Sequence, residues 1–304
     1  MKRPRLACRI ALVASLSLSA LSMAAEPQVV PVARLASAPA VDGRLTEWSA
    51  GGWVEIPIAP TVKREDRASL GLGNEDHNAV GEIRVKLQMG VHEGRIYVAV
   101  RWPDDAPDTD LDVWQWNGRR YSRLRRYDDM FAMRFALAGD YDRSMLSGKN
   151  YETDLWEWSA SRSQLAGFAE DFRQVISTRI IENAAEYSVN GVGTVYIKKY
   201  RDEGNYPFKT VRPPKEQGAE RLIAVELNGA PDGSYADVAA QGTWADGHWQ
   251  LELSRKLVTG NSDDVAIPAG GTITGQIAVF NHAADENKSV SEPLRFDLSG
   301  VPLK

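Results

Sequence analysis

Residues 83–102 read IRVKLQMGVHEGRIYVAVRW. Apolar side chains occupy every second position in two runs, at 83–89 and at 96–102, and the segment Glu93-Gly94-Arg95 separates the runs. This alternation is typical of strands with one buried face, and a short glycine-containing turn between two such runs is typical of a β-hairpin. The stretch therefore predicts two antiparallel strands joined by a tight turn.

The same alternation recurs along the rest of the chain. Further runs are found at residues 131–135, 249–253, 273–279 and 294–298. Helical periodicity is scarce, and residues 161–171 hold the one short helix that we expect. Strands at this spacing, with turn residues between them, predict an all-β fold: an immunoglobulin-like antiparallel β-sandwich with little helix. We expect long loops at 64–78 and 202–217, the second of which contains three prolines.

The composition is that of an ordinary globular protein. The 304 residues are 43% hydrophobic and 25% charged. The formal net charge of −5 argues against a nucleic-acid-binding protein, which needs a basic surface. We find no linker that would divide the chain and no internal repeat, so we expect one domain over residues 26–304.

The first 25 residues resemble a secretory signal. Basic residues precede an apolar run at 10–23, which ends in small residues and is short for a membrane span. We therefore expect cleavage before Glu26, export, and no membrane span in the mature chain; an uncleaved anchor is the alternative. Cys8 is the only cysteine. The mature chain, with a net charge of −9 once four basic residues are lost, would then form no disulfide and attach no haem through cysteine.

Motifs of common enzymes are missing. The four histidines show no metal-ligand spacing, and there is no nucleophile elbow, phosphate loop or dinucleotide-binding motif. The adjacent acids at 104–105 and 128–129 would point to opposite faces of a strand, so we interpret them as solvated turns. These observations favour a binding or electron-carrying protein over an enzyme with its own nucleophile.

Several local motifs, taken in order, resemble one family. They are Val41-Asp42-Gly43-Arg44-Leu45-Thr46-Glu47-Trp48, the strand at 95–104, Asp154-Leu155-Trp156-Glu157-Trp158, the segment 242–257, and the segment 277–291. Together they resemble the haem-binding domain of the ethylbenzene dehydrogenase γ-subunit group and of related cytochrome c-552 and DMSO-reductase-type proteins. That domain is a DOMON-like sandwich similar to family-nine carbohydrate-binding modules, and the resemblance spans about residues 41–298.

The resemblance implies a periplasmic electron-transfer subunit or carrier that is not itself the catalyst. It implies one non-covalent haem b, and a redox partner such as a molybdopterin enzyme with an iron–sulfur subunit. By resemblance, the axial ligands of the iron are Met145 and Lys288, with His282 as the alternative nitrogen ligand. The family pattern has glycine directly after the methionine, whereas here Gly148 comes three residues later.

Four further residues are candidates for the cofactor site. Trp156 and Trp158 lie two positions apart and therefore face the same side of a strand; we expect one in the core and one in the wall of the haem pocket. Arg125 and Arg126 end a run of five arginines at 119–126. Guanidinium groups bind carboxylates, so the run would pair with haem propionates or dock an acidic partner, with a solvated loop as the alternative. A carbohydrate-binding module without haem, in which exposed tryptophans stack on sugar rings, is the alternative function.

Overall fold

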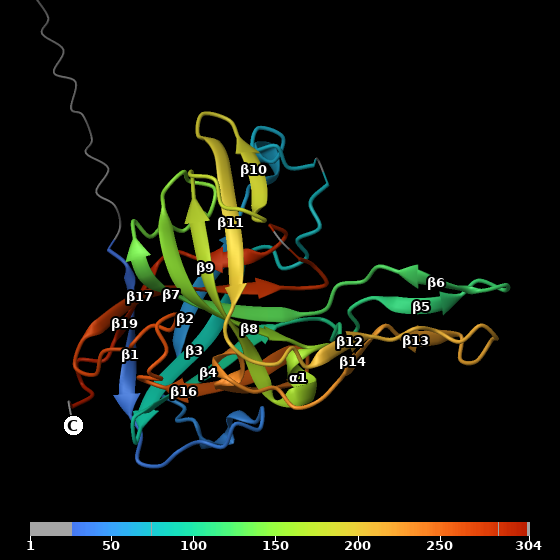
Figure 1. Cartoon of the computed structure of the whole chain (residues 1–304). Helices are drawn as coiled ribbons and strands as arrows, with labels where there is room; N and C mark the ends of the chain where they lie inside the picture. Colours follow the sequence, from blue (N-terminus) through green and yellow to red (C-terminus); the bar gives the residue numbers. More distant parts are fainter. Residues whose placement is uncertain (1–25, 74, 285, 303–304) are drawn as a thin grey trace, which may run out of the picture.

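The protein, described here by a computed structural model for residues 26–73, 75–284 and 286–302, is almost entirely β (Figure 1). Strands account for 46% of it and helices for 5%, which confirms the all-β prediction. The signal predicted at residues 1–25 lies outside the described residues. In the described part of the chain, no helix is long and apolar enough to cross a membrane.

Two layers of a sandwich form from one continuous sheet of mostly antiparallel strands. The first layer contains β1 (Gln28–Arg34), β2 (Val54–Pro60), β3 (Ile83–His92), β4 (Arg95–Pro103), β15 (Val238–Ala245) and β16 (His248–Lys256). The second contains β7 (Met130–Gly139), β8 (Tyr151–Ser159), β9 (Phe168–Ser177), β10 (Ala185–Val189), β11 (Gly193–Arg201) and β17 (Thr272–Phe280), with the short strands β18 (Ser289–Ser291) and β19 (Leu294–Asp297). The pairings of β18 with β2, of β15 with β9 and of β1 with β19 join the layers.

The hairpin predicted from residues 83–102 is confirmed. Strands β3 and β4 are antiparallel, with His92 opposite Arg95. Glu93 and Gly94 both have positive φ angles, of 46° and 75°, which is the backbone of a tight turn whose twist matches that of the flanking strands. The runs at 131–135, 249–253, 273–279 and 294–298 also lie in strands, namely β7, β16, β17 and β19.

The helical segments are all short. The helix expected within 161–171 is the single turn α1 (Ser163–Ala166), and the 3-10 turns are η1 (Leu45–Glu47), η2 (Arg64–Asp66) and η3 (Ser234–Ala236). The predicted loop at 202–217 contains a short strand, β12 (Phe208–Thr210), paired with β14 (Val225–Leu227). The strand forms because Phe208 is buried and stacks on Phe168, with ring centroids 6.1 Å apart.

A three-stranded arm projects away from the sandwich (Figure 1). It consists of β5 (Val113–Trp116), β6 (Tyr121–Leu124) and β13 (Arg221–Ile223), which form a sheet of their own. Arg119, Arg120 and Arg123 are exposed at its tip and along β6. The arm therefore carries a concentration of positive charge away from an acidic protein.

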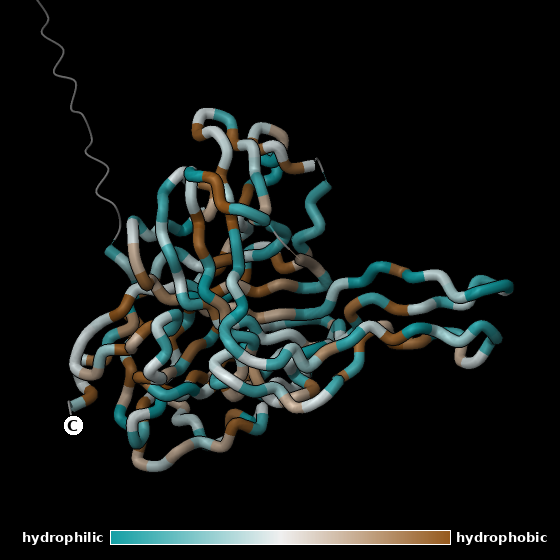
Figure 2. Tube along the Cα trace, in the orientation of Figure 1, coloured by the Kyte–Doolittle hydropathy of each residue, from teal (hydrophilic) through white to brown (hydrophobic). Residues whose placement is uncertain are grey.

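The core lies between the two layers. Hydrophobic and hydrophilic residues alternate along many of the strands (Figure 2). The inward faces meet around a group of indole rings: Trp102 lies 6.2 Å from Trp158 and 6.3 Å from Trp249, between ring centroids. A strand of the second layer thus packs one face in this core, and its other face points away from the core.

The prediction that the acid pairs at 104–105 and 128–129 are solvated turns is wrong for three of the four residues. Asp104, Asp128 and Asp129 are buried, and only Asp105 is exposed. The carboxylate of Asp129 accepts hydrogen bonds from the indole N–H of Trp249 at 3.0 Å and from a backbone N–H at Asp108 at 2.7 Å. These donors come from distant segments, so the acids stabilise the junction between the arm and the sandwich.

Candidate functional site

The outer face of the second layer carries a pocket. Along β7, Phe131, Met133 and Phe135 point into the core. The alternate residues Met130, Ala132 and Arg134 line the pocket. Because successive side chains of a strand point to opposite faces, one strand builds both environments. The same rule applies to β8, where Leu155 and Glu157 line the pocket.

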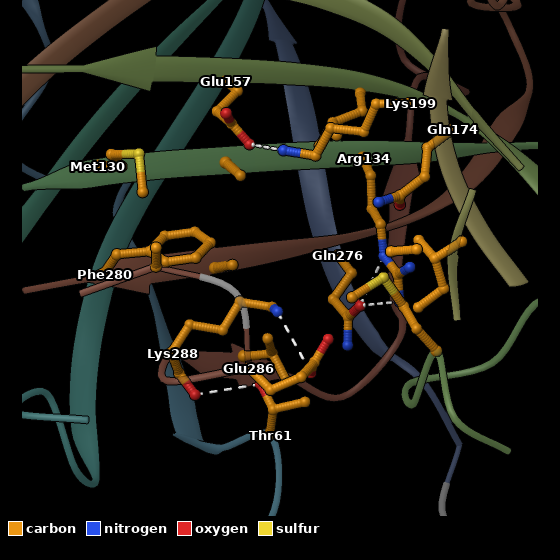
Figure 3. Close-up of a pocket in the computed structure, with 18 of the residues that line it drawn as sticks. Thr61, Met130, Arg134, Glu157, Gln174, Lys199, Gln276, Phe280, Glu286 and Lys288 are labelled. Atoms are coloured by element: carbon orange, nitrogen blue, oxygen red, sulfur yellow. Dashed lines mark hydrogen bonds and ion pairs between the residues drawn. The ribbon is translucent and has the colours of Figure 1, made fainter. Parts of the chain in front are cut away.

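The cavity has a volume of about 480 Å³, which is within the range of small-molecule and cofactor sites (Figure 3). Strands β7, β8, β9, β11 and β17 form its floor and walls, and residues from the loops 140–150 and 281–288 complete it. Its apolar surface includes Met130, Leu155, Phe280 and Val290, which pack together as a small cluster. A flat apolar ligand would find hydrophobic contacts on this side of the cavity.

Met145 lies in the loop between β7 and β8 and lines the cavity. It is 9% exposed and packs with Leu146 and Tyr151. Hydrogen bonds from backbone N–H groups hold the loop: Ser144 donates to Asp142 at 2.9 Å, and Leu146 donates to the hydroxyl of Ser144 at 3.2 Å. The sequence suggests a polar loop here, yet the loop folds back and buries its methionine.

Lys288 lines the same cavity and immediately precedes β18. It is 8% exposed, and its Nζ lies 3.3 Å from Oε2 of Glu286 (Figure 3). The carbonyl oxygen of Lys288 accepts hydrogen bonds from the backbone N–H and the hydroxyl of Thr61, at 3.0 and 3.1 Å, which fixes the backbone. Burial lowers the pKa of Lys288 below its usual value, although Glu286 acts in the opposite direction.

The structure thus brings Met145 and Lys288 to one cavity from two loops that are far apart in the sequence. The alternative nitrogen ligand, His282, does not line this cavity. Its backbone has a φ of 47°, its side chain is 43% exposed, and its Nδ1 lies 3.1 Å from Asp108. The imidazole therefore belongs to the acidic junction at the base of the arm.

The four other candidates also lie away from the cavity. Trp156 and Trp158 are both completely buried in the core, in place of the pocket wall expected for one of them. Their shared face is the core face of β8, so neither can turn toward the cavity without reversing the strand register. Arg125 and Arg126 lie between the arm and β7. Arg125 is exposed, and its guanidinium carbon lies 5.1 Å from the ring centroid of Tyr127.

Positive charge predominates around the cavity. Among the described residues that line it, six are basic and two, Glu157 and Glu286, are acidic. Burial alone would raise the pKa of Glu157, but Lys199 and Arg162 beside it lower it overall, so this acid is ionised and paired. An anionic group on a ligand would therefore be attracted to this site.

Arg134 is a buried member of this set of cations. It is 8% exposed, and its guanidinium donates to neutral acceptors, including the amide oxygen of Gln276 and the hydroxyl of Tyr151. Among the described residues, no carboxylate forms an ion pair with it. Burial alone would lower the pKa of Arg134, but Tyr141, Tyr151 and Glu286 outweigh burial and raise this pKa overall. Arg134 therefore stays charged, and a carboxylate brought into contact by a ligand would pair with it.

A family model described as ethylbenzene dehydrogenase matches residues 46–291. The chain belongs to the ethylbenzene dehydrogenase family. The matched range covers most of the sandwich and includes both Met145 and Lys288. Members of the ethylbenzene dehydrogenase family are subunits of dehydrogenase complexes. No match to this chain is found among curated proteins.

Sequence reasoning missed two charged residues of this ethylbenzene dehydrogenase family member. Arg134 is the only charged residue in the strand Met130–Gly139, and a charge within such an apolar strand is a signal that its face is not ordinary core. Glu286 stands two residues before Lys288 and is 5% exposed. Its burial could not be predicted from the polar segment in which it lies, because the residues that bury it come from other parts of the chain.

Proposed function

We propose that this protein is an electron-transfer subunit that binds one haem b without a covalent bond in the cavity described above. The observation that carries the proposal is the meeting of Met145 and Lys288 at one buried cavity. In this proposal Met145 and Lys288 are the axial ligands of the iron. The bound haem would take up and release single electrons, while the protein sets its potential and its docking geometry.

The chemistry of the donor pair fits an electron-transfer haem. A thioether is a soft, neutral ligand that raises the reduction potential of haem iron. Lysine can bind iron only as the neutral amine, and its unperturbed pKa is about 10.4. Burial of Lys288 favours the neutral form, which is the direction that ligation requires. With both axial positions filled by side chains, the protein excludes a substrate from the iron.

The remaining groups of the cavity fit the rest of a haem. The apolar cluster of Met130, Leu155, Phe280 and Val290 would contact the macrocycle. Arg134, which forms no ion pair with a carboxylate of the described residues, would pair with a propionate, because guanidinium and carboxylate form strong charge-assisted hydrogen bonds. These side chains would also keep water away from the iron.

We further propose that the protein works in the periplasm as the haem-carrying, non-catalytic part of a dehydrogenase or reductase complex. Its redox partner would be a molybdopterin enzyme with an iron–sulfur subunit. Family membership supports a place in a dehydrogenase complex, and the apolar N-terminal segment supports export. The arginine-rich arm would dock an acidic surface of this partner, since charge complementarity speeds encounter and fixes orientation.

The sugar-binding alternative receives little support. All nine tryptophans lie among the described residues, and none of them is exposed. Trp116, on the arm, is half-buried and packs edge-on against Tyr121, with ring centroids 5.1 Å apart. None of the tryptophans therefore lies fully open on the surface, as a platform for a sugar ring would.

Haem titration of the purified protein tests the proposal. We expect one haem per chain, with a Soret band that shifts when dithionite is added. The Lys288→Leu variant, whose side chain cannot ligate iron, should lose the low-spin spectrum. Lys199→Leu removes another lysine of the cavity and should keep it, as should His282→Ala. A protein that stays colourless after haem loading would contradict the proposed function, and loss of the low-spin spectrum in His282→Ala alone would show that the nitrogen ligand is wrong.

A further inference from the structure

A second group of charged residues lies apart from the haem cavity. Two buried acids from neighbouring strands, Asp154 on β8 and Asp171 on β9, meet acids from elsewhere in the chain. These are Asp202, which follows β11, and Asp263 with Asp264 in the connection between β16 and β17. We call these five residues the acid cluster. None of them lines the haem cavity.

One guanidinium compensates only part of this charge. Arg255 is fully buried, and its Nη1 lies 2.7 Å from Asp154, 3.3 Å from Asp171 and 3.6 Å from Asp264. In the part of the chain that the structure describes, Asp202 and Asp263 form no ion pair with any basic side chain. Arg255 therefore contacts three of the five acids and leaves the other two without a basic partner among the described residues.

An independent observation points to a missing ligand. Asp202 is 4% exposed, and neither of its carboxylate oxygens has a hydrogen-bond donor among the described residues. One oxygen each of Asp171 and Asp264 is likewise buried without a donor. Buried carboxylates are normally paired or bound to a metal, because an uncompensated buried charge costs several kcal/mol. Burial and the neighbouring carboxylates of Asp263 and Asp264 raise the pKa of Asp202 to about 8, so without a cation a proton neutralises this group, and a bound cation would take the place of that proton.

The geometry separates two possible positions for a cation. Carboxylate oxygens of Asp154, Asp171 and Asp264 lie within 4.8 Å of one another, but the guanidinium of Arg255 already contacts all three residues. Oxygens of Asp202, Asp263 and Asp264 also lie within 4.8 Å of one another. A Ca²⁺ ion binds oxygens at about 2.4 Å, so two opposite ligands are about 4.8 Å apart. The second trio is the better candidate for a metal ion, because Arg255 contacts only one of its three residues, Asp264.

We propose that Asp202, Asp263 and Asp264 bind a Ca²⁺ ion. The donors are all carboxylate oxygens, which hard cations prefer, and calcium accepts irregular sites completed by water. Asp263 is half-buried, so the ion has a route from solvent and room for water ligands. The ion would link the end of β11 to the loop between β16 and β17 and would stabilise both.

Calcium titration of metal-free protein tests this site without any haem. The protein is first treated with EGTA, then titrated with CaCl₂ or MgCl₂ in a calorimeter, and its melting temperature is measured in parallel. We expect one Ca²⁺ per chain, a higher melting temperature with Ca²⁺, and weaker binding of Mg²⁺. Asp263→Asn should weaken Ca²⁺ binding at least tenfold, because it removes a charged ligand at the half-exposed edge of the site.

The control is Glu216→Gln, which removes one negative charge from an exposed loop residue and should bind Ca²⁺ like the wild type. Absence of Ca²⁺ binding to the wild-type protein would overturn the proposal. Equal binding by Asp263→Asn and the wild type would also overturn it, since the ion would then lie elsewhere. Should Asp202→Asn fold, judged by its circular dichroism, it must lose Ca²⁺ binding as well.

Discussion

Replacing Arg255 by methionine should destabilise the protein strongly. Arg255 has no exposed surface, and its three carboxylate neighbours are 0 to 1% exposed, so solvent does not screen these ion pairs. Its guanidinium also donates to the carbonyl oxygen of Val265 at 2.8 Å. Methionine keeps much of the side-chain volume but leaves the buried carboxylates without their cation. Removing one partner of a buried ion pair costs about 3–5 kcal/mol, and we expect a loss in this range.

Urea denaturation at pH 7.5 in the presence of EGTA measures this loss without any contribution from a bound metal. Burial already raises the pKa of Asp154, and Arg255 counteracts this effect. Without the arginine the acids would bind protons more tightly, so the loss of stability should be smaller at pH 5 than at pH 7.5. The control Arg84→Met changes an exposed arginine and should alter the free energy of unfolding by less than about 0.5 kcal/mol. A loss below about 1 kcal/mol in Arg255→Met would refute the idea that this cation holds the acids together.

Three further predictions concern other parts of the molecule. Burial raises the pKa of Asp129 to about 7. The stability that this residue contributes is therefore complete below the unfolded pKa of about 4 and is lost as the pH rises through 7. In Asp129→Asn, the free energy of unfolding measured with urea should therefore fall less between pH 4 and 8 than in the wild type. Gly242→Ala would place a Cβ 2.4 Å from the buried ring of Trp158 and should cost about 1–3 kcal/mol in the same assay; an unchanged midpoint would show that the ring moves freely. Export with cleavage predicts a mature N-terminus near Glu26, which sequencing of the periplasmic fraction measures; an intact N-terminus in the membrane pellet would contradict it.

The strands could be predicted because one face of each strand is apolar and the other is polar. Period-two alternation marks β3, β4, β7 and β16 in the sequence, and the glycine turn at 93–95 fixes the first hairpin. The arm could not be predicted in this way. Its strands are only three or four residues long, and they depend on pairing between segments that are about a hundred residues apart.

The site was only partly accessible to sequence reasoning. Met145 and Lys288 were found through resemblance to a family, and nothing in their local sequence indicates that they are buried. Alternation correctly gives Trp156 and Trp158 a shared face, but it does not say which face is the core. Which face of a strand packs in the core can be decided only when the neighbouring strands are known. The neighbours of β8 are β7 and β9.

Buried acids were the least predictable feature. Asp128 looks like part of a solvated turn, yet its carboxylate accepts hydrogen bonds from the backbone N–H and the hydroxyl of Ser161, at 2.9 and 2.7 Å. The acid cluster likewise gathers residues from β8, from β9 and from two loops. Sequence shows each acid alone, and only the fold shows that they share one arginine.

Carbon monoxide binding to the reduced, haem-loaded protein tests the central claim most directly. The wild type should not bind carbon monoxide, because Met145 and Lys288 would fill both axial positions of the iron. Met145→Ala should open one position, lower the reduction potential and give a carbon monoxide complex. Met130→Leu, which removes another thioether from the same cavity but keeps an apolar side chain of similar size, should exclude carbon monoxide like the wild type. The account would be contradicted if Met145→Ala kept the wild-type spectrum and potential and still did not bind carbon monoxide.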